Sequence, residues 1–264
     1  MCATLHRVRN ATLEALRASS SRSALMLSAA LPLLAAGDSP GTLDHHRLVT
    51  HLLGESVELL ASRALHWPAT RMLFVADVHL GKAAAFRSGG VPVPRGATAA
   101  NLDRLSTLIE TTGARTLVVL GDFLHAAAGR VPALEAAFLT WRRKQASLAM
   151  LLVRGNHDAH AGDPPKTWGI DVVSEPHPLA PFLACHRPHS PATGYALCGH
   201  IHPGIWVTGR ARESARLPCF LLGPRRALLP AFGRFTGLAT VTPAADEIAV
   251  AIAGERLFRL PPRC

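Results

Sequence analysis

Hydrophobic and polar positions alternate along the middle of the chain in a pattern that predicts strands followed by helices. Short apolar runs that end in polar residues are typical of buried strands, and they occur at 71–77, 116–122 and 148–158. The segments between them, 97–112 and 131–145, carry apolar residues at helical spacing. Strand, helix, strand, helix, strand in this order predicts an α/β fold with a largely parallel sheet.

Shorter apolar segments flank this region. Residues 55–67 predict two short strands around a turn, and after residue 180 strands joined by turns predict a more β-rich second half. These later segments are "PFLACH", "YALCGH", "GIWVTG", "PCFLLG" and "EIAVAIAG". We find no internal repeat or low-complexity tract here, and we expect one domain at 51–264.

Residues 1–50 lack this regular pattern, and we expect them to form a poorly ordered extension. Their apolar run at 24–37 is too short to span a bilayer, so no transmembrane segment is predicted. The run is similar to the hydrophobic core of a secretory signal. Two interpretations stay open: a disordered tail or start-site extension of a cytoplasmic protein, which we favour, and a cleaved export signal.

The chain is strongly basic, with a formal net charge of +10 and a pI near 10.6. Lysine occurs only at Lys82, Lys144 and Lys166, so arginine supplies most of this charge. Arginine binds phosphate in two-pronged fashion, which favours a phosphate-bearing partner, although a compositional bias explains the excess equally well. Five cysteines without a CxxC spacing do not indicate a disulfide scaffold, and they suit a reducing cytoplasm.

Residues able to bind a metal follow five of the predicted strands. The stretches are "ADVH" with Asp77 and His79, "GDFLH" with Asp122 and His125, "RGNHD" with Asn156, His157 and Asp158, "ACH" with His186, and "CGHIH" with His200 and His202. Open α/β sheets bind ligands beyond the carboxyl ends of their strands. Each stretch alone is a common turn or surface feature, and Asn156 alone could cap a helix, but five together predict a metal site.

Local geometry suggests how two of these stretches present their ligands. Residues two apart share a face in extended chain, so we expect Asp77 and His79 to project together, as do His200 and His202. Pro203 and Gly204 would stop the last strand and leave a rigid rim. Mixed carboxylate, imidazole and amide ligands suit divalent manganese, iron or zinc, and the lack of thiolates argues against a structural zinc site.

The order DxH, GD, GNHD, H and GHxH resembles the signature of calcineurin-like metallophosphoesterases, over about residues 55 to 240. The longer run "VADVHLGKAAAFRSGGVPVPRGATAANLDRL" is similar to one subgroup, the ligase-associated endonucleases of the DNA-damage response (PdeM type). The resemblance implies an α/β fold of four layers, in which helices flank two mixed β-sheets. It also implies two divalent metal ions, with Mn²⁺ favoured over iron or zinc.

The resemblance assigns a role to each motif residue. Asp77, His79 and His202 would hold the first metal, Asp122 would bridge, and Asn156, His186 and His200 would hold the second. His157 would be the catalytic histidine near the leaving group, while the metal pair would activate water for attack on phosphorus. His189 is a rival to His186. Asp158 would either orient His157 or be an ordinary surface acid.

Substrate contacts are the least specific part of this interpretation. The candidates close to the motifs are His125, Lys82, Arg87, Arg95, Arg154 and Arg187, each of which could instead be a solvated charge or, for His125, a support for the ligands. Few aromatic residues lie near the motifs, so we expect contacts to the phosphate backbone of a nucleic acid rather than base reading.

Three functions are consistent with the sequence. The first is a DNA endonuclease or phosphodiesterase of the DNA-damage response, with a DNA ligase or helicase of a repair operon as a partner. The second is a small-molecule phosphatase or nucleotide phosphodiesterase, exported if residues 1–37 are a signal. The third is a non-catalytic scaffold, which the complete set of motif residues disfavours.

Overall fold

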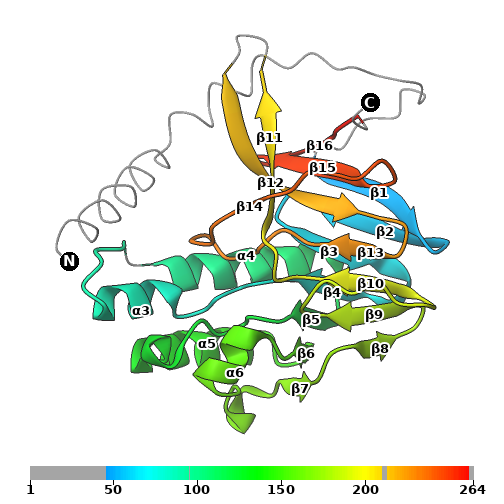
Figure 1. Cartoon of the computed structure of the whole chain (residues 1–264). Coiled ribbons are helices and arrows are strands. Elements are labelled where there is room, and N and C mark those ends of the chain that lie inside the picture. Colours follow the sequence, from blue (N-terminus) through cyan, green and yellow to red (C-terminus); the bar gives the residue numbers. More distant parts are fainter. Residues whose placement is uncertain (1–45, 95, 210–212, 262–264) are drawn as a thin grey trace. The chain divides into compact units, whose positions relative to one another are not determined.

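The computed structural model describes residues 46–94, 96–209 and 213–261 (Figure 1). Most of the predicted N-terminal extension therefore lies outside the described residues. The first described strand, β1, begins at Arg47. Ordered sheet structure thus starts a few residues before the expected boundary at 51.

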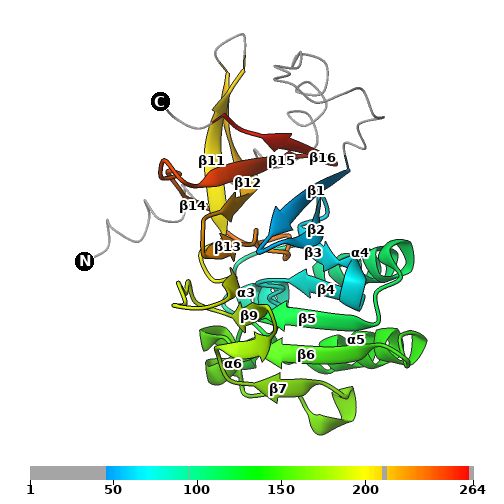
Figure 2. The ribbon, with the colours of Figure 1, turned by 90° about the vertical axis from the view of Figure 1, so that its right-hand side faces the viewer.

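Seven strands form the first sheet, in sequence order, and Figure 2 shows several of them one below another. They are β1 (Arg47–Leu52), β2 (Glu55–Leu60), β3 (Ala64–Trp67), β4 (Met72–Val75), β5 (Thr116–Leu120), β6 (Ala149–Val153) and β7 (Asp171–Val173). Strands β1 to β4 pair antiparallel, whereas β4 to β7 are parallel. The sheet is therefore mixed, and its parallel half coincides with the predicted strand–helix alternation.

The second sheet contains nine strands and is also mixed. They are β8 (His177–Leu179), β9 (Phe182–Cys185), β10 (Tyr195–Cys198), β11 (Pro203–Thr208), β12 (Ser214–Leu222), β13 (Arg226–Leu228), β14 (Ala239–Thr240), β15 (Ile248–Ala253) and β16 (Arg256–Arg259). Strands β9, β10 and β13 are parallel, whereas β12 pairs antiparallel with β13 and β15. The β-rich second half predicted from the sequence is confirmed.

Four α-helices lie among the described residues: α3 (Lys82–Ser88), α4 (Ala97–Thr112), α5 (Pro132–Lys144) and α6 (Asn156–Ala161). Three short 3₁₀ helices accompany them: η2 (Pro68–Thr70), η3 (Ala127–Gly129) and η4 (Lys166–Trp168). Helix α5 begins with proline and ends with three basic residues, which matches the backbone geometry of a first turn and the helix dipole. None of the described helices has the length and apolar character needed to cross a membrane.

Alternate residues of the first sheet contribute to two separate hydrophobic cores. Leu73 and Val119 pack with side chains of α4 and α5, such as Leu105 and Phe138. Phe74 and its same-face neighbours pack with strands of the second sheet. This period of two places helices on one face of the first sheet and the second sheet on the other, which confirms the α/β sandwich with two mixed sheets.

Candidate metal centre

All the predicted ligands follow the carboxyl ends of parallel strands. Asp77 and His79 follow β4, Asp122 follows β5, Asn156 is the first residue of α6 after β6, His186 follows β9, and His200 and His202 follow β10. Backbone hydrogen bonds connect the loops, since the N–H of Asp77 donates to Gly121 O (3.1 Å) and that of His79 to Asp122 O (2.9 Å). The N–H of Gly199 likewise donates to His186 O at 3.0 Å. The loops therefore form one connected edge.

The backbone at these loops is not extended. The expectation that residues two apart share a face of extended chain therefore does not apply here. Five of the predicted ligands have φ between 50° and 70°, in the left-handed region: Asp77, His79, Asp122, His200 and His202. Non-glycine residues rarely adopt this conformation, and it is concentrated at functional sites. The period-two argument for Asp77 with His79 and for His200 with His202 was therefore wrong, although the paired residues still belong to one site.

Pro203 and Gly204 also act differently from the prediction. Strand β10 ends at Cys198, and Pro203 is the first residue of β11. The dipeptide therefore begins the next strand and does not stop the previous one. Proline is tolerated there because the first position of a strand need not donate to a ladder.

The first cluster of ligands consists of Asp77, His79 and His202. Their candidate ligand atoms lie within 4.8 Å of one another. Nε2 of His202 is 3.5 Å from Oδ1 of Asp77 and 3.4 Å from Nε2 of His79. Asp77 and His79 are buried, and His202 reaches the surface.

The second cluster consists of Asp122, His186, His200 and Asn156. Nε2 of His186 lies 2.9 Å from Oδ1 of Asn156, 3.0 Å from Nδ1 of His200 and 3.4 Å from Oδ1 of Asp122. His186 is fully buried, whereas its rival His189 is exposed. Asn156 is the first residue inside α6, and Gly155 takes the N-cap position, so Asn156 does not cap the helix.

Asp122 lies between the two clusters. Its Oδ1 faces His186 at 3.4 Å, and its Oδ2 faces His79 at 3.9 Å. The backbone N–H of His157 donates to Oδ1 at 2.9 Å and holds the carboxylate in this orientation. One carboxylate that presents one oxygen to each cluster has the geometry required of a bridging ligand.

The surroundings of His79 and His200 favour the neutral imidazole that binds a cation. Burial, with the positive charge of Lys82 next in importance, lowers the pKa of His79 to about 2. Burial and then the neighbouring His186 lower the pKa of His200. Nδ1 of His186 lies 3.1 Å from the carbonyl oxygen of Leu120, so the Nδ1–H donates there and leaves a lone pair on Nε2.

That lone pair faces other acceptors. The Oδ1 atoms of Asn156 and Asp122 lie 2.9 and 3.4 Å from Nε2 of His186, and Nδ1 of His200 lies 3.0 Å from it. Amide oxygen, carboxylate oxygen and imidazole nitrogen are ligand atoms that suit a divalent cation. The donor chemistry of the cluster therefore fits a divalent metal ion.

Glycines give the loops the space for this approach. A Cβ on Gly155 would meet Oδ1 and the backbone nitrogen of Asp122, and one on Gly121 would meet the ring of His186. A Cβ on Gly199 would lie 2.7 Å from Leu120 O. The glycines of GD, GN and GH thus permit close contact between the loops.

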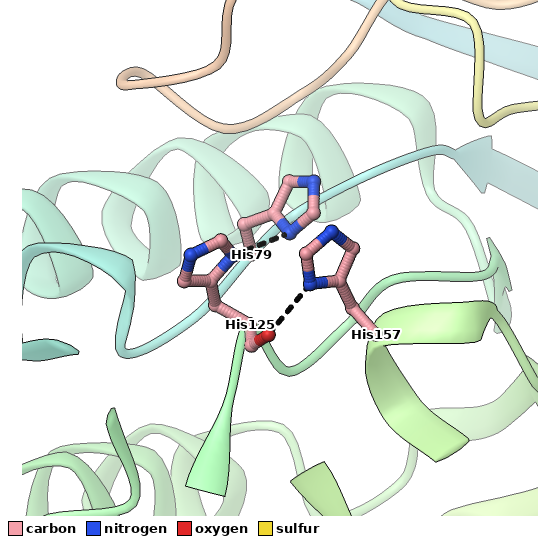
Figure 3. A group of neighbouring side chains, drawn as sticks. All are labelled: His79, His125 and His157. Atoms are coloured by element: carbon pink, nitrogen blue, oxygen red, sulfur yellow. Dashed lines mark hydrogen bonds between the residues drawn. The ribbon is translucent and has the colours of Figure 1, made fainter. Parts of the chain in front are cut away.

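His125 and His157 lie beside the first cluster (Figure 3). Their rings stack at a centroid distance of 4.8 Å, and Nδ1 of His125 is 3.3 Å from Nδ1 of His79. Nδ1 of His157 donates to the carbonyl oxygen of His125 at 2.7 Å, and Nε2 of His157 lies 4.0 Å from Oδ2 of Asp122. Burial and then the charge of Lys82 lower the pKa of His125 to about 4.

Asp158 is neither a surface acid nor a partner of the His157 ring. It is fully buried, and its carboxylate accepts the backbone N–H groups of Leu124 (2.8 Å) and Gly155 (3.0 Å). His157 is oriented instead by the carbonyl of His125. Asp158 therefore fastens the loop after β5 to the loop after β6.

The predicted substrate contacts differ in their placement. Lys82 is half-buried and close enough to Asp122 and Asp77 for their charges to act on its pKa, which burial lowers. Arg187 is exposed, pairs with Glu175, and acts on the pKa of His200. Arg87 donates instead to the carbonyl oxygens of Val93 and Pro94.

The remaining arginine of the described part of the chain is paired with an acid. Arg154 is engaged in a two-pronged ion pair with Asp163. Arg95 lies outside the described residues. Of the described arginine and lysine candidates, Lys82 and Arg187 are those whose charges act on the pKa of a ligand histidine.

Glu175 was missed by the sequence reasoning. Its Oε2 accepts the backbone N–H of His186 at 2.6 Å and that of Arg187 at 2.8 Å. It lies between β7 and β8, so no strand-end motif marks it. Only its spatial position beside the loop after β9 indicates a supporting role.

The family model for calcineurin-like phosphoesterases matches residues 70–202, which is half of the chain and contains every ligand described above. The chain belongs to the calcineurin-like phosphoesterase family. It is accordingly a metal-dependent phosphoester hydrolase. The two clusters supply the side chains that fit divalent metal ions.

Among solved structures, the phosphoesterase is similar to the Pseudomonas putida nuclease MPE, with 42% identity and a TM-score of 0.71. The match covers 81% of this chain and 100% of that one. An Aquifex aeolicus protein of unknown function, AQ665, is 18% identical with a TM-score of 0.33, covering 50% of this chain and 78% of that one. The Escherichia coli phosphoesterase Yfce is 13% identical with a TM-score of 0.37, covering 73% and 99%.

The last two likenesses are too weak to carry an argument. A comparison with curated protein sequences found no match.

Proposed function

We propose that this phosphoesterase is a nuclease that hydrolyses phosphodiester bonds of DNA. The observation that carries the proposal is the similarity to the Pseudomonas putida nuclease MPE, at 42% identity over the whole of that chain. The basic net charge of +10 supports a polyanionic substrate. The sparse aromatic content of 5% favours contacts to the phosphate backbone over stacking on bases.

Two divalent ions would be held by the two clusters: one by Asp77, His79 and His202, the other by Asn156, His186 and His200, with Asp122 shared. When bound, such a pair supplies Lewis acidity toward the phosphate and lowers the pKa of water. We propose Mn²⁺ because mixed carboxylate, imidazole and amide donors suit it, with iron and zinc as the alternatives.

His157 is proposed to protonate the leaving oxygen. Its Nδ1–H is anchored on the carbonyl of His125, so Nε2 is the ring nitrogen left to carry the proton that would be donated. Its side chain is 38% exposed, so a substrate can reach it. Asp158 positions the backbone that carries His157 and does not exchange a proton itself.

Lys82, His125 and Arg187 are proposed to contact the phosphates. Lys82 and Arg187 bring positive charge to opposite clusters, since they act on His79 and His200 respectively. The lowered pKa of His125 keeps its ring neutral, so it would donate or accept a hydrogen bond without adding charge. We propose no substrate contact for Arg154, because Asp163 already occupies its guanidinium.

The cellular setting of this activity remains a proposal supported by sequence similarity alone. The long motif around Asp77 and His79 is similar to the ligase-associated subgroup, which supports a role in the DNA-damage response with a DNA ligase or helicase as partner. We propose a cytoplasmic location and a domain that follows the N-terminal extension.

The test is hydrolysis of single- and double-stranded DNA and of bis(p-nitrophenyl) phosphate with Mn²⁺. We expect His157→Ala to lower the rate by about 10²–10⁴-fold on DNA, and Asp122→Asn to abolish it. His51→Ala, an exposed histidine on β1, is the matched control and should match wild type.

Equal residual activity in wild type, H157A and D122N would overturn the proposal. Hydrolysis of the small diester or of nucleotides without any cleavage of DNA would instead support the small-molecule alternative.

A further inference from the structure

Three arginines from distant parts of the chain meet at the segment 231–234. Arg63, in the turn between β2 and β3, donates to the carbonyl oxygen of Ala231 at 3.1 Å. Arg104, on α4, donates to the next carbonyl, that of Phe232, and its guanidinium lies 3.8 Å from the centroid of the Phe232 ring. Arg234 follows two residues later and is exposed.

No acidic side chain of the described residues pairs with any of these arginines. Burial, and then the charges of neighbouring arginines, lower the pKa of Arg104 to about 9 and also lower that of Arg63. Nε of Arg104 is buried and has no hydrogen-bond partner among the residues described. Like charges held together without a counter-charge attract an anion from solution.

The arginine cluster (Arg63, Arg104 and Arg234) adjoins the metal centre. The N–H of Phe232 donates to Ala76 O at 2.7 Å, and that of Gly233 donates to Asp77 O at 3.1 Å, so the segment packs on the ligand loop. Arg234 lines the same cavity as His79 and Lys82. Arg234 therefore brings the charge of the cluster to the cavity beside the first group of ligands.

We propose that the arginine cluster is a second phosphate subsite, which binds a non-scissile phosphate of the DNA strand through Arg234. Arg63 and Arg104 hold the positive potential behind it, because their guanidinium groups are fixed on consecutive carbonyls. A planar guanidinium matches a phosphodiester geometrically, and a charge-assisted contact is strong where positive charge is otherwise uncompensated. The subsite rests on the proposed nuclease function.

The experiment compares wild type with Arg234→Glu and Arg234→Ala on two substrates with Mn²⁺. On an oligonucleotide we expect R234E to raise KM roughly tenfold or more, as for loss of one charge-assisted contact. For R234A, the slope of log affinity against log salt for single-stranded DNA should become less negative by about 0.7. On bis(p-nitrophenyl) phosphate, which is too short to reach the cluster, all three proteins should be equal.

Arg143→Glu is the matched control. Arg143 is exposed in the last turn of α5, which precedes β6 and therefore lies at the opposite edge of the parallel sheet from the ligands. R143E should leave both the KM for the oligonucleotide and the salt slope close to wild type.

The outcomes separate the two proposals. If wild type hydrolyses the small diester but no oligonucleotide, the nuclease proposal fails. If wild type cleaves both and R234E keeps the wild-type KM and salt dependence on the oligonucleotide, the subsite is wrong while the nuclease stands. An equal loss in R234E and R143E would also overturn the subsite, because it would show a general effect of charge.

Discussion

At the scale of single residues, the centre depends on backbone conformations that most side chains avoid. Asp77, His79, Asp122, His200 and His202 all have left-handed φ values. Each such residue costs of order 1–3 kcal/mol and persists only where the surroundings fix it. The hydrogen bonds between the loops, and the buried carboxylate of Asp158, are the contacts that fix them here.

Replacement of Asp158 by alanine should therefore destabilise the protein as well as the site. The change leaves the buried N–H groups of Leu124 and Gly155 without an acceptor, so we expect the free energy of unfolding to fall by about 2–4 kcal/mol. Urea denaturation measures this. Asp103→Ala, an exposed acid on α4, is the control, and equal midpoints for D158A and D103A would contradict the role given to Asp158.

Replacement of Gly155 by alanine should disable the centre through a steric clash and not through backbone strain. Gly155 has φ of −89°, which alanine adopts freely, but its Cβ would meet the Asp122 carboxylate. We expect G155A to lose about 10²-fold or more of its activity, in line with the misplacement of a catalytic group. The measurement is Mn²⁺-dependent hydrolysis of bis(p-nitrophenyl) phosphate.

Gly89→Ala is the matched control. Gly89 has φ of −84°, and a Cβ there would meet its nearest atom, Phe86 O, at an ordinary 3.5 Å. G89A should keep wild-type activity, and activity retained in G155A would show that the loops have more room than the structure gives them.

At the scale of elements, the sequence predicted the helices and strands whose apolar residues repeat with a clear period. The helix expected at 97–112 is α4, and the strands expected after residue 180 are all present. The short elements α3, α6, β7, β8, β13, β14 and β16 were not predicted, since their few residues carry no measurable period. The site residues were predicted from motif and order, but their left-handed backbone and the support from Glu175 depend on contacts between distant segments.

The loop between β7 and β8 supports the second cluster through Glu175, and its removal should weaken metal binding. Glu175→Ala frees the backbone N–H groups of His186 and Arg187, so the His186 ring loses its fixed position. We expect roughly tenfold lower Mn²⁺ affinity, as is typical for residues that orient ligands.

Calorimetric titration with Mn²⁺ measures this. Glu175→Gln keeps an accepting oxygen and should stay near the wild-type affinity. If E175A binds Mn²⁺ as tightly as E175Q does, the support assigned to this loop is wrong.

At the scale of the whole molecule, the described strands begin a few residues before the expected domain boundary at 51. Strand β1 pairs with β2 along six residues from Arg47 to Leu52. A chain that starts at residue 46 keeps this strand, whereas one that starts at residue 54 exposes the edge of β2. Under our proposal of a separate extension, the first should keep the melting temperature and activity of the full chain.

The second truncation should melt about 2–8 °C lower, the shift expected for a loss of about 1–2 kcal/mol in a domain of this size. Scanning calorimetry compares the three proteins. Equal melting temperatures for the two truncations would show that β1 contributes nothing to the sheet.

The central claim is that loops from both sheets gather two divalent metals around Asp122. Anomalous X-ray diffraction from crystals grown with Mn²⁺ tests it most directly. The account predicts two anomalous peaks, one against Asp77, His79 and His202 and the other against Asn156, His186 and His200, each also in contact with Asp122. Peaks absent from these side chains, or a single peak that leaves one cluster empty at saturating Mn²⁺, would contradict it.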